Sequence, residues 1–252
     1  MWLLDLGNSR LKLARAGADG LGPVLALPYE GPELESRLRA ALAGDGAPAW
    51  WASVAPDERS ARVAAVLAEG GRRVERVHSR REALGLRIAY ADPARLGVDR
   101  FLALLAARAL GGAHLLASFG SALTVDLLDA EGRHRGGLVG IAPWHARQAL
   151  AARFPALDRG EAEAVPGFAD DTPAAVAGGV EAQALGLLLV AWHEARALLP
   201  EPPRVSVAGG DATRLAPRLA ALLGVSVERA EHRVLEGLHR LAVAEGALPG
   251  RC

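Results

Sequence analysis

Three short turns in the chain combine glycine with hydroxyl, amide or carboxylate side chains. They read DLGNS at 5–9, SFGSALT at 118–124 and AGGDA at 208–212. Glycine lets a backbone approach a ligand closely, and neighbouring amides and hydroxyls can point at the oxygens of an anion such as phosphate. Any one of these turns is also ordinary hairpin chemistry, but their combination favours phosphate binding. The sequence has no G-x-x-x-x-G-K-[ST] motif and no G-x-G-x-x-G at the start of a helix, which argues against a P-loop or Rossmann site.

Asp5 lies between Leu4 and Leu6 in a segment that is otherwise apolar and predicts a buried strand. A buried carboxylate needs a partner that offsets its desolvation. A magnesium ion keeps most of its waters and is commonly held by one or two carboxylates and substrate phosphates, so a lone acid beside a phosphate turn is sufficient. The alternative is that Asp5 accepts hydrogen bonds from its own turn, as Asx residues do.

Asp99 and Arg100 are adjacent opposite charges in the stretch ARLGVDRFLA, between a flexible Gly97-Val98 pair and an unbroken apolar run. One interpretation is structural, because an acid in the first turn of a helix is favoured by the positive end of the helix dipole. The other interpretation is a functional site. The pair alone does not decide between them.

The overall composition excludes several classes of protein. Lys plus Arg and Asp plus Glu number 29 each, so there is no net field or basic block to hold a nucleic acid. Cys252 is the sole cysteine, which leaves no internal disulfide and indicates a reducing compartment, so we expect a cytoplasmic protein. The amino end lacks the pattern of a signal peptide. The apolar run 184–192 is about half the length that crosses a bilayer, so we expect no membrane partner.

The chain has two similar halves. Segment 2–16 has apolar residues on both sides of Gly-Asn-Ser, and the segment from His114 turns at Gly120-Ser121 between two apolar runs. Each half therefore opens with two strands joined by a small-residue turn. The length of 252 residues, 51% of them hydrophobic, suits two domains of ordinary size. We place the boundary at the glycines 111 and 112, which gives an N-terminal domain 1–112 and a C-terminal domain 113–252.

Strands and helices alternate between these landmarks. We expect further strands within 48–56, 72–79, 204–212 and 225–230, and helices at 58–71, 99–111, 173–199, 214–224 and 233–245. This alternation predicts an α/β architecture of mixed sheets covered by helices.

The order of the motifs resembles that of type III pantothenate kinase, the family that phosphorylates pantothenate at the first step of coenzyme A synthesis. DLGNSRLK (5–12) is similar to the family's first phosphate motif, and FGSALTVD (119–126) to its second. YADPARLGVDR (90–100) is similar to its pantothenate-binding stretch ending in G-x-D-R, the most specific part of the resemblance. The same order continues with glycines at 136–137, IAP at 141–143, DTPAAVAGG at 171–179 and AGGDA.

The resemblance implies a fold of the acetate and sugar kinase, Hsp70 and actin superfamily, with two RNase H-like domains of mixed sheets flanked by helices. The duplication in the sequence agrees with that fold. The resemblance also implies a homodimer, in which Thr172 reaches the pantothenate bound by the neighbouring subunit. It implies pantothenate and ATP as substrates, and Mg²⁺ as the metal.

The resemblance assigns roles to individual residues. It implies that Asp99 is the general base that accepts the proton of the pantothenate hydroxyl, and that Arg100 helps to hold pantothenate and keeps Asp99 ionised. It places Tyr90, Gly97 and Val98 with these two in the pantothenate site. Asp5 helps to hold Mg²⁺, and the ATP site comprises Asp5, Leu6, Gly7, Asn8, Ser9, Arg10, Leu11, Lys12 and Ser121.

Three positions depart from the family pattern. Where the second phosphate motif usually begins with an aspartate that binds potassium or ammonium, this chain has Ser118, so we expect that monovalent cation to bind weakly. Ser121 replaces the usual threonine and keeps its hydroxyl. Trp144 stands where a glycine usually follows the proline of the G-G-x-I-x-P-G motif, and it either narrows the nucleotide cleft or turns outward.

Two other functions match parts of the pattern. A catalytically weak relative that acts as a regulatory or accessory protein would accommodate the changes at 118 and 144. Such a protein has no need of the full set Asp5, Asp99, Arg100 and Thr172. A sugar kinase of the same superfamily would share the phosphate turns, but it does not account for residues 90–100. We therefore expect an ATP-dependent pantothenate kinase.

Overall fold

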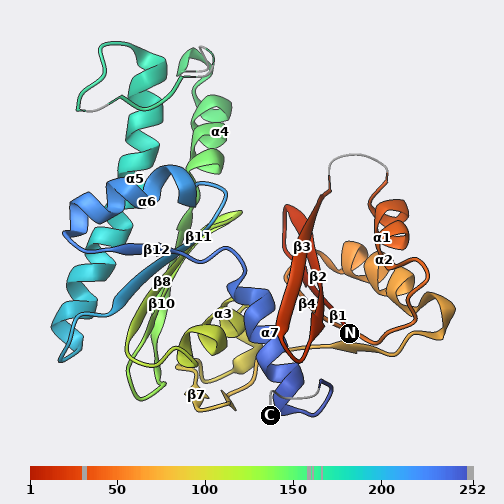
Figure 1. The fold of residues 1–252 in the computed structure, drawn as a ribbon. Coiled ribbons are helices and arrows are strands. Elements are labelled where there is room, and N and C mark those ends of the chain that lie inside the picture. The colour runs from red at the N-terminus through yellow and green to blue at the C-terminus, as the bar shows by residue number, and fades with distance from the viewer. Residues whose placement is uncertain (30–32, 158–159, 161, 166, 249–252) are drawn as a thin grey trace. The chain divides into compact units, whose positions relative to one another are not determined.

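The computed structural model describes residues 1–29, 33–157, 160, 162–165 and 167–248. The chain divides into two compact units (Figure 1). The first unit holds Met1–Gly111, Glu131–His134 and the chain from His232 onward, and the second holds Gly112–Ala130 and Arg135–Glu231. Each unit has its own five-stranded sheet and its own apolar core.

The first unit is built on a sheet with the strand order β3-β2-β1-β4-β5. Its strands are β1 (Trp2–Leu6), β2 (Arg10–Gly17), β3 (Gly20–Pro28), β4 (Ala49–Ser53) and β5 (Val74–Arg76). β2 pairs antiparallel with both β1 and β3, whereas β4 pairs parallel with both β1 and β5. A separate hairpin joins β6 (Glu82–Ala83) to β7 (Leu86–Arg87). Its turn residues Leu84 and Gly85 both have positive φ, 50° and 77°, as the favoured two-residue hairpin turn requires.

Helices cover both faces of this first sheet (Figure 1). α1 (Leu34–Leu42) and α2 (Asp57–Ala68), the latter followed by a 3-10 turn at Glu69–Gly71, bury leucines and valines against Leu4 and Leu6 of β1. α3 (Val98–Arg108) follows a 3-10 turn at Pro93–Arg95 and packs on α7 (Arg233–Ala244), which contacts β1 to β4. Because side chains alternate along a strand, Leu3 and Asp5 face the side of the sheet that α3 and α7 cover.

The C-terminal helix α7 belongs to the first unit, which differs from the predicted C-terminal domain 113–252. α7 crosses α3 so closely that a Cβ built on Gly237 would lie 1.9 Å from the carbonyl oxygen of Leu102. A glycine at the crossing allows the two backbones to approach. The same helix buries Leu235, Leu238 and Leu241. The end of the chain therefore returns to the first sheet, a long-range contact that no local pattern signals.

The second unit repeats the topology of the first. Its strands are β8 (His114–Phe119), β9 (Ala122–Leu128), β10 (His134–Ile141), β11 (Arg204–Gly209) and β12 (Val227–Arg229). They are ordered β10-β9-β8-β11-β12, with β8 antiparallel to β9 and parallel to β11, and β11 parallel to β12. When the five strands of each sheet are counted in chain order, both sheets have the order third, second, first, fourth, fifth. The duplication expected from the sequence is confirmed at the level of strand order.

The helices of the second unit are α4 (Pro143–Arg153), α5 (Thr172–Leu198) and α6 (Ala212–Leu223), with a 3-10 turn at Pro155–Leu157. Among the described residues, α5 is the one helix whose length and composition alone would let it cross a membrane. Its apolar face instead forms part of the second core, through Ala184, Leu185, Leu188, Ala191, Trp192 and Ala195. We interpret α5 as the core helix of this unit.

The expected architecture of mixed sheets flanked by helices is confirmed. The five predicted helices appear as α2, α3, α5, α6 and α7, each within three residues of its expected bounds. The strands β3 and β10, the helices α1 and α4, and the β6–β7 hairpin were not predicted from the sequence. The boundary glycines at 111 and 112 separate the two units on the first pass of the chain.

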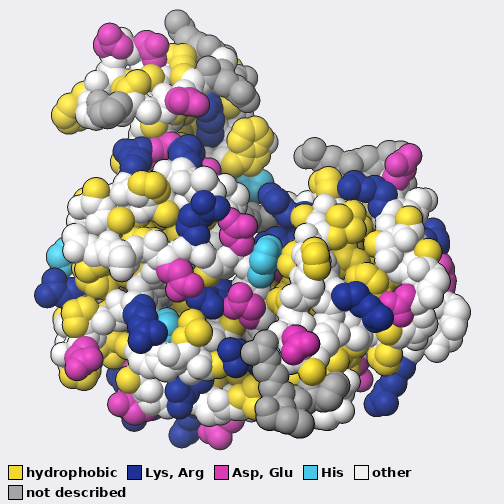
Figure 2. Space-filling view, viewed as in Figure 1, with side chains coloured by type: hydrophobic (Ala, Val, Ile, Leu, Met, Phe, Trp, Pro, Cys, Tyr) yellow, Lys and Arg dark blue, Asp and Glu magenta, His cyan; other side chains and the backbone are white. Residues whose placement is uncertain are grey.

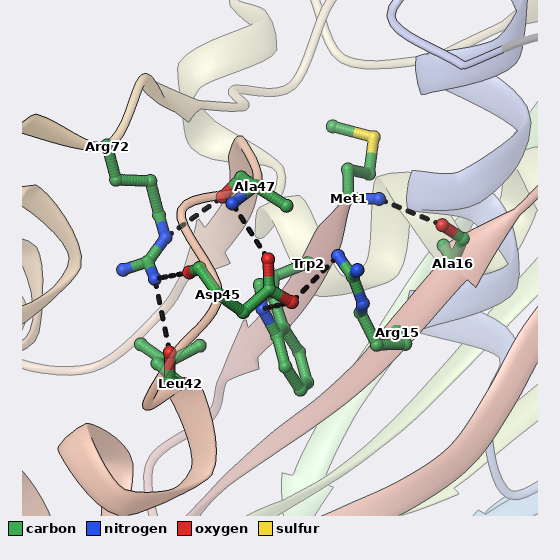
Figure 3. A network of polar contacts seen from close by, with 8 residues as sticks. All are labelled: Met1, Trp2, Arg15, Ala16, Leu42, Asp45, Ala47 and Arg72. Atoms are coloured by element: carbon green, nitrogen blue, oxygen red, sulfur yellow. Dashed lines mark hydrogen bonds and ion pairs between the residues drawn. The ribbon is translucent and has the colours of Figure 1, made fainter.

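A polar network fastens the loop before β4 to the first two strands (Figure 3). One Asp45 carboxylate oxygen accepts from the indole N–H of Trp2 at 3.0 Å and pairs with Arg15 at 3.0 Å, while the other accepts from the backbone N–H of Ala47 at 2.8 Å. These contacts, that of Ala47 above all, hold the pKa of Asp45 below its usual value. Arg72 donates to the carbonyl oxygen of Ala47 at 2.9 Å. The network thereby fixes the start of β1, the strand that carries Asp5.

Charged side chains are mixed on the surface. On the face shown in Figure 2, Lys and Arg alternate with Asp and Glu, and neither sign gathers into one patch. Exposed apolar side chains occur in the second unit, at Val139 and Ile141 of the edge strand β10 and at Trp144 of α4, which is 55% exposed. β10 therefore presents an apolar strip to solvent.

The close crossing of α3 and α7 predicts that Gly237→Ala destabilises the protein. The added methyl would overlap the backbone of Leu102, and overpacking of this kind costs about 1–3 kcal/mol or more in the free energy of unfolding. Denaturant unfolding measures the change. The matched control is Gly186→Ala in α5, where nothing lies within 4 Å of the new Cβ and a gain of about 0.5–1 kcal/mol is expected. Equal stability of the two variants would contradict the close crossing.

Candidate active site

The first phosphate turn joins β1 to β2 in the first unit. Asp5 is the penultimate residue of β1, where it pairs with Lys12 of β2 and Ala52 of β4. A hydrogen bond of 3.2 Å from the Gly7 N–H to the Arg10 carbonyl oxygen closes the turn. The residues at positions 8 and 9 are exposed. The turn thus offers solvent-facing backbone directly after a carboxylate.

The predicted ATP-site residues of this hairpin divide by the direction of their side chains. Leu6 and Leu11 are fully buried in the core under α1 and α2. Their side chains hold the hairpin on that core, so neither side chain is available to a nucleotide. Lys12 lies on the same face of the sheet as Asp5, because the two residues are register partners.

Asp99 lies in the first turn of α3, as both interpretations of the sequence require. Its carboxylate folds back over the helix start, where it accepts a hydrogen bond of 2.8 Å from the backbone N–H of Arg100. A Cβ built on Gly97 would lie only 2.6 Å from this carboxylate oxygen. Gly97 therefore provides the space that the Asp99 carboxylate occupies. The N–H donor and the helix N-terminus both stabilise negative charge on that carboxylate.

Asp5 and Asp99, which are 94 residues apart in the sequence, interact electrostatically. The pKa of Asp5 is raised from its usual 3.8 to about 7, first by burial and then by the negative charge of Asp99, while Lys12 opposes the rise. Like charges shift a pKa in this way only when they are close. The carboxyl group next to the phosphate turn and the carboxyl group at the start of α3 therefore belong to one site within the first unit.

The other predicted pantothenate-site side chains are brought together beside Asp99. Arg100 donates to the Tyr90 hydroxyl at 3.3 Å, and its guanidinium carbon lies 5.8 Å from the centroid of the Tyr90 ring. His134 stacks on the same ring, with centroids 6.0 Å apart and planes 8° apart, and its Nδ1 accepts from the backbone N–H of Ala89 at 3.5 Å. Val98 is buried in the helix start. Sequence reasoning missed His134, whose neighbours in the sequence give no sign of this stack.

Two further residues contact the first phosphate turn and were not predicted. The Tyr29 hydroxyl donates to the carbonyl oxygen of Gly7 at 2.7 Å. Arg59 of α2 donates to the carbonyl oxygen of Asn8 at 3.2 Å, and its guanidinium carbon lies 4.1 Å from the centroid of the Tyr29 ring. A phenol directly after a strand and an arginine in a helix have no distinctive spacing, so the sequence carries no signal for them.

The second and third glycine turns are neighbours in the second unit. Phe119 of β8 pairs in register with Gly209 of β11, and the N–H of Gly210 donates to the Phe119 carbonyl oxygen at 3.0 Å. Gly209 has φ of +97°, and a Cβ on it would lie 2.1 Å from that oxygen, so the position requires glycine. Ser121 lies in the tight turn between β8 and β9. This unit therefore joins two of the three predicted phosphate turns at one edge of its sheet.

Ser118, which was assigned from the sequence to a cation-binding position, brings only a neutral oxygen. It lies in β8 opposite Thr124 of β9 and Ala208 of β11. Both chain neighbours of Ser118 belong to the apolar core, so its side chain faces the opposite side of the sheet. Asp126 lies on that same face two residues along β9 and is buried. Ser118 itself thus contributes a neutral oxygen to this face, and the negative charge nearby comes from Asp126.

Thr172 and Trp144 lie in the helices of the second unit. Thr172 is the first residue of α5, next to Asp171, whose carboxylate caps the helix by accepting from the Ala174 N–H at 2.8 Å. Thr172 is exposed and lines a pocket of about 510 Å³ between α4 and α5. Trp144 in α4 is 55% exposed, so its side chain is largely in solvent.

The donor set around Asp5 suits a magnesium ion that has few protein ligands. Burial and the negative charge of Asp99 both raise the pKa of Asp5, and a divalent cation beside the two carboxyl groups would favour their charged forms. Within the described part of the chain, no group of three or more His, Cys, Asp or Glu side chains is arranged to hold a metal. Magnesium commonly binds through one or two carboxylates, substrate phosphates and water, and Asp5 meets that requirement.

Known proteins resemble this chain in both sequence and fold. The sequence model of the type III pantothenate kinase family matches residues 1–194. A relative from Stenotrophomonas maltophilia (strain R551-3), named type III pantothenate kinase, is 40% identical over 252 residues, which cover 98% of each chain.

Solved structures share the fold at low sequence identity. A Campylobacter jejuni protein assigned to the Baf family of transcriptional activators has a TM-score of 0.63 at 16% identity, covering 98% of this chain and 100% of its own. MreB 5 of Spiroplasma citri, solved with AMPPNP, has a TM-score of 0.52 at 11% identity, covering 98% and 96%. These likenesses confirm the expected actin-like fold. The family match and the 40% identity go further and confirm the expectation of a kinase: the chain belongs to the type III pantothenate kinase family.

Proposed function

We propose that the protein transfers the γ-phosphoryl group of ATP to the primary alcohol of pantothenate, giving 4'-phosphopantothenate and ADP, the first step of coenzyme A synthesis. The observation that carries this proposal is that Asp5, beside the phosphate turn, and Asp99, at the start of α3, lie close enough in the first unit to interact electrostatically. Family membership supports the same reaction.

Asp99 acts in this proposal as the general base. The pantothenate hydroxyl oxygen forms a bond to the γ-phosphorus, the bond between that phosphorus and the ADP oxygen breaks, and the hydroxyl proton passes to Asp99. Arg100 and Tyr90 hold the acceptor, since the guanidinium can address a carboxylate or an amide with several donors. Their mutual hydrogen bond of 3.3 Å keeps both side chains in one orientation.

The first hairpin binds ATP in this proposal. Leu6 and Leu11 are turned into the core. The groups that remain to face the nucleotide are the backbone of residues 5–12 and the side chains of Asn8, Ser9, Arg10 and Lys12. Asp5 would hold Mg²⁺, which when bound to the phosphates neutralises charge on them. Lys12 lies beside Asp5 and adds a positive charge to the same face.

We further propose that the protein is a cytoplasmic homodimer. Thr172 is exposed at the start of α5, where it is available to a pantothenate molecule bound by the neighbouring subunit. The apolar strip of β10, with Val139 63% and Ile141 51% exposed, is surface that a second copy would cover.

The reaction is tested by ADP release in the presence of pantothenate, glucose or no acceptor. We expect ADP only with pantothenate, and we expect Asp99→Asn to lower kcat by about 10²- to 10⁴-fold, because the amide cannot accept the proton. Asp57→Asn makes the same change in the first turn of α2 and serves as the control with unchanged turnover. ADP release with glucose but not with pantothenate would support a sugar kinase. Absence of turnover with every acceptor would support an accessory protein. Parent-like turnover of Asp99→Asn would remove Asp99 from the role of base.

Replacement of Gly97 is expected to lower activity and to leave folding almost unchanged. In Gly97→Ala the new Cβ would lie 2.6 Å from the Asp99 carboxylate oxygen, and the side chain can relieve this contact by moving. Stability should change little, whereas kcat should fall by about tenfold or more, because small displacements of a reacting group are costly. Gly46→Ala, with open space around its Cβ, is the control. Full activity of Gly97→Ala would show that the observed Asp99 position is not required.

Potassium and ammonium are expected to change the rate by less than about twofold at constant ionic strength, because the oxygen of Ser118 carries no charge. Rates measured with potassium, ammonium or a large organic cation as the sole monovalent cation test this expectation. Ser118→Asp restores the family's carboxylate and should make the rate depend on potassium. Strong activation of the parent enzyme would show that another group, such as Asp126, supplies the charge.

A further inference from the structure

Tyr29 and Arg59 approach the first phosphate turn from outside it. Tyr29 directly follows β3, and Arg59 lies in the first turn of α2. Their three contacts form a closed arrangement: hydroxyl to the Gly7 carbonyl, guanidinium to the Asn8 carbonyl, and guanidinium over the phenol ring. Two consecutive carbonyl groups of the turn are thus engaged by side chains that are themselves in contact.

The peptide geometry of the turn gives these contacts a consequence. In a trans peptide the carbonyl and the N–H of one plane point in opposite directions. A hydrogen bond that fixes the Gly7 carbonyl therefore also fixes the direction of the Asn8 N–H, and a bond to the Asn8 carbonyl fixes that of the Ser9 N–H. Both N–H groups then point away from Tyr29 and Arg59. Backbone N–H groups of a glycine turn are the donors that cradle phosphate oxygens.

The Tyr29 hydroxyl and the Arg59 guanidinium are held in place as hydrogen-bond donors to the turn. Burial raises the pKa of the Tyr29 hydroxyl well above its usual value, so the phenol keeps its proton and remains a donor. The ring also packs against the core of the first unit. A guanidinium 4.1 Å from the ring centroid gains a cation–π attraction. The two side chains therefore order one another before any ligand binds.

We propose that Tyr29 and Arg59 are positioning residues that preorganise the turn at 7–9 for the phosphates of ATP. The proposal rests on the proposed function, since it takes the nucleotide to bind at this turn. It predicts an effect on nucleotide affinity and none on pantothenate affinity, because Tyr29 and Arg59 donate to the Gly7 and Asn8 carbonyl groups of the phosphate turn.

The experiment compares Tyr29→Phe, Arg59→Gln and the double variant. Phenylalanine keeps the ring and removes the donor, and glutamine removes the guanidinium while leaving a neutral amide. Dissociation constants for ADP and for a non-hydrolysable ATP analogue are measured in magnesium buffer without pantothenate. We expect each single variant to weaken nucleotide binding by about three- to twentyfold, as loss of one buried or charge-assisted hydrogen bond does. The double variant should lose less than the product of the two, because the residues act as one unit.

Arg62→Gln is the matched control. It removes an arginine from the same helix, where Arg62 pairs with Glu35, and it leaves the turn untouched. Nucleotide affinity of this variant should equal that of the parent. Arg59→Lys keeps the positive charge without the planar guanidinium, and it should bind nucleotide less tightly than the parent.

The outcomes separate this proposal from the proposed reaction. A raised KM for ATP with an unchanged KM for pantothenate and an unchanged Tm supports the positioning role. Unchanged nucleotide affinity, or a parallel loss of ATP affinity, pantothenate affinity and Tm, overturns it in favour of no role or a purely structural one. If the parent binds nucleotide but does not phosphorylate pantothenate, the reaction fails, whereas weaker nucleotide binding by the variants still supports the positioning role.

Discussion

The electrostatic interaction between Asp5 and Asp99 is the constraint on which the candidate site of the first unit depends. Two like charges in a partly buried place repel one another, so the surrounding structure must hold them together. β1 holds Asp5 between β2 and β4, and α3 holds Asp99, with α7 closing over α3 at Gly237. Gly97 leaves the room that the second carboxylate occupies. Groups kept close against their mutual repulsion are typical of sites retained for chemistry.

Local signals in the sequence were sufficient for the elements that carry the motifs. Short motifs of adjacent residues predicted the turn at 7–9, the start of α3 and the turn at 209–211. Helical periodicity and a proline in the first turn predicted helices such as α5. The repeated sequence pattern of strand, turn and strand predicted a duplicated unit, which agrees with the equal strand order of the two sheets. By contrast, α7 joins the first unit by crossing α3, which is distant from it in the sequence. β3 lacks a clean alternation of buried and exposed residues, and α1 lacks a side-chain cap at its start.

The residues of the candidate site also divide into those that a sequence motif predicted and those that depend on tertiary contacts. Asp5, Tyr90, Asp99 and Arg100 were predicted because a motif names them, and their proximity in the first unit follows from how β1 and α3 fold. Tyr29, Arg59 and His134 were not predicted because they act on backbone carbonyls or on the face of another ring. Such contacts depend on tertiary structure and leave no spacing in the sequence. Residues of this kind prepare a site by orienting the groups that touch the ligand.

The departures from the family pattern fall in one unit, and this limits what they can affect. Ser118, Ser121 and Trp144 all belong to the second unit, whereas the proposed base, the acceptor-holding side chains and the proposed magnesium ligand belong to the first. Loss of a carboxylate at Ser118 removes charge from the β8–β9 face, and the exposed Trp144 adds bulk to α4. Both positions lie outside the unit that holds Asp99 and the first turn. The departures from the family pattern are therefore confined to the second unit, whereas the residues proposed to hold and deprotonate the alcohol at 90 and 97–100 keep that pattern in the first.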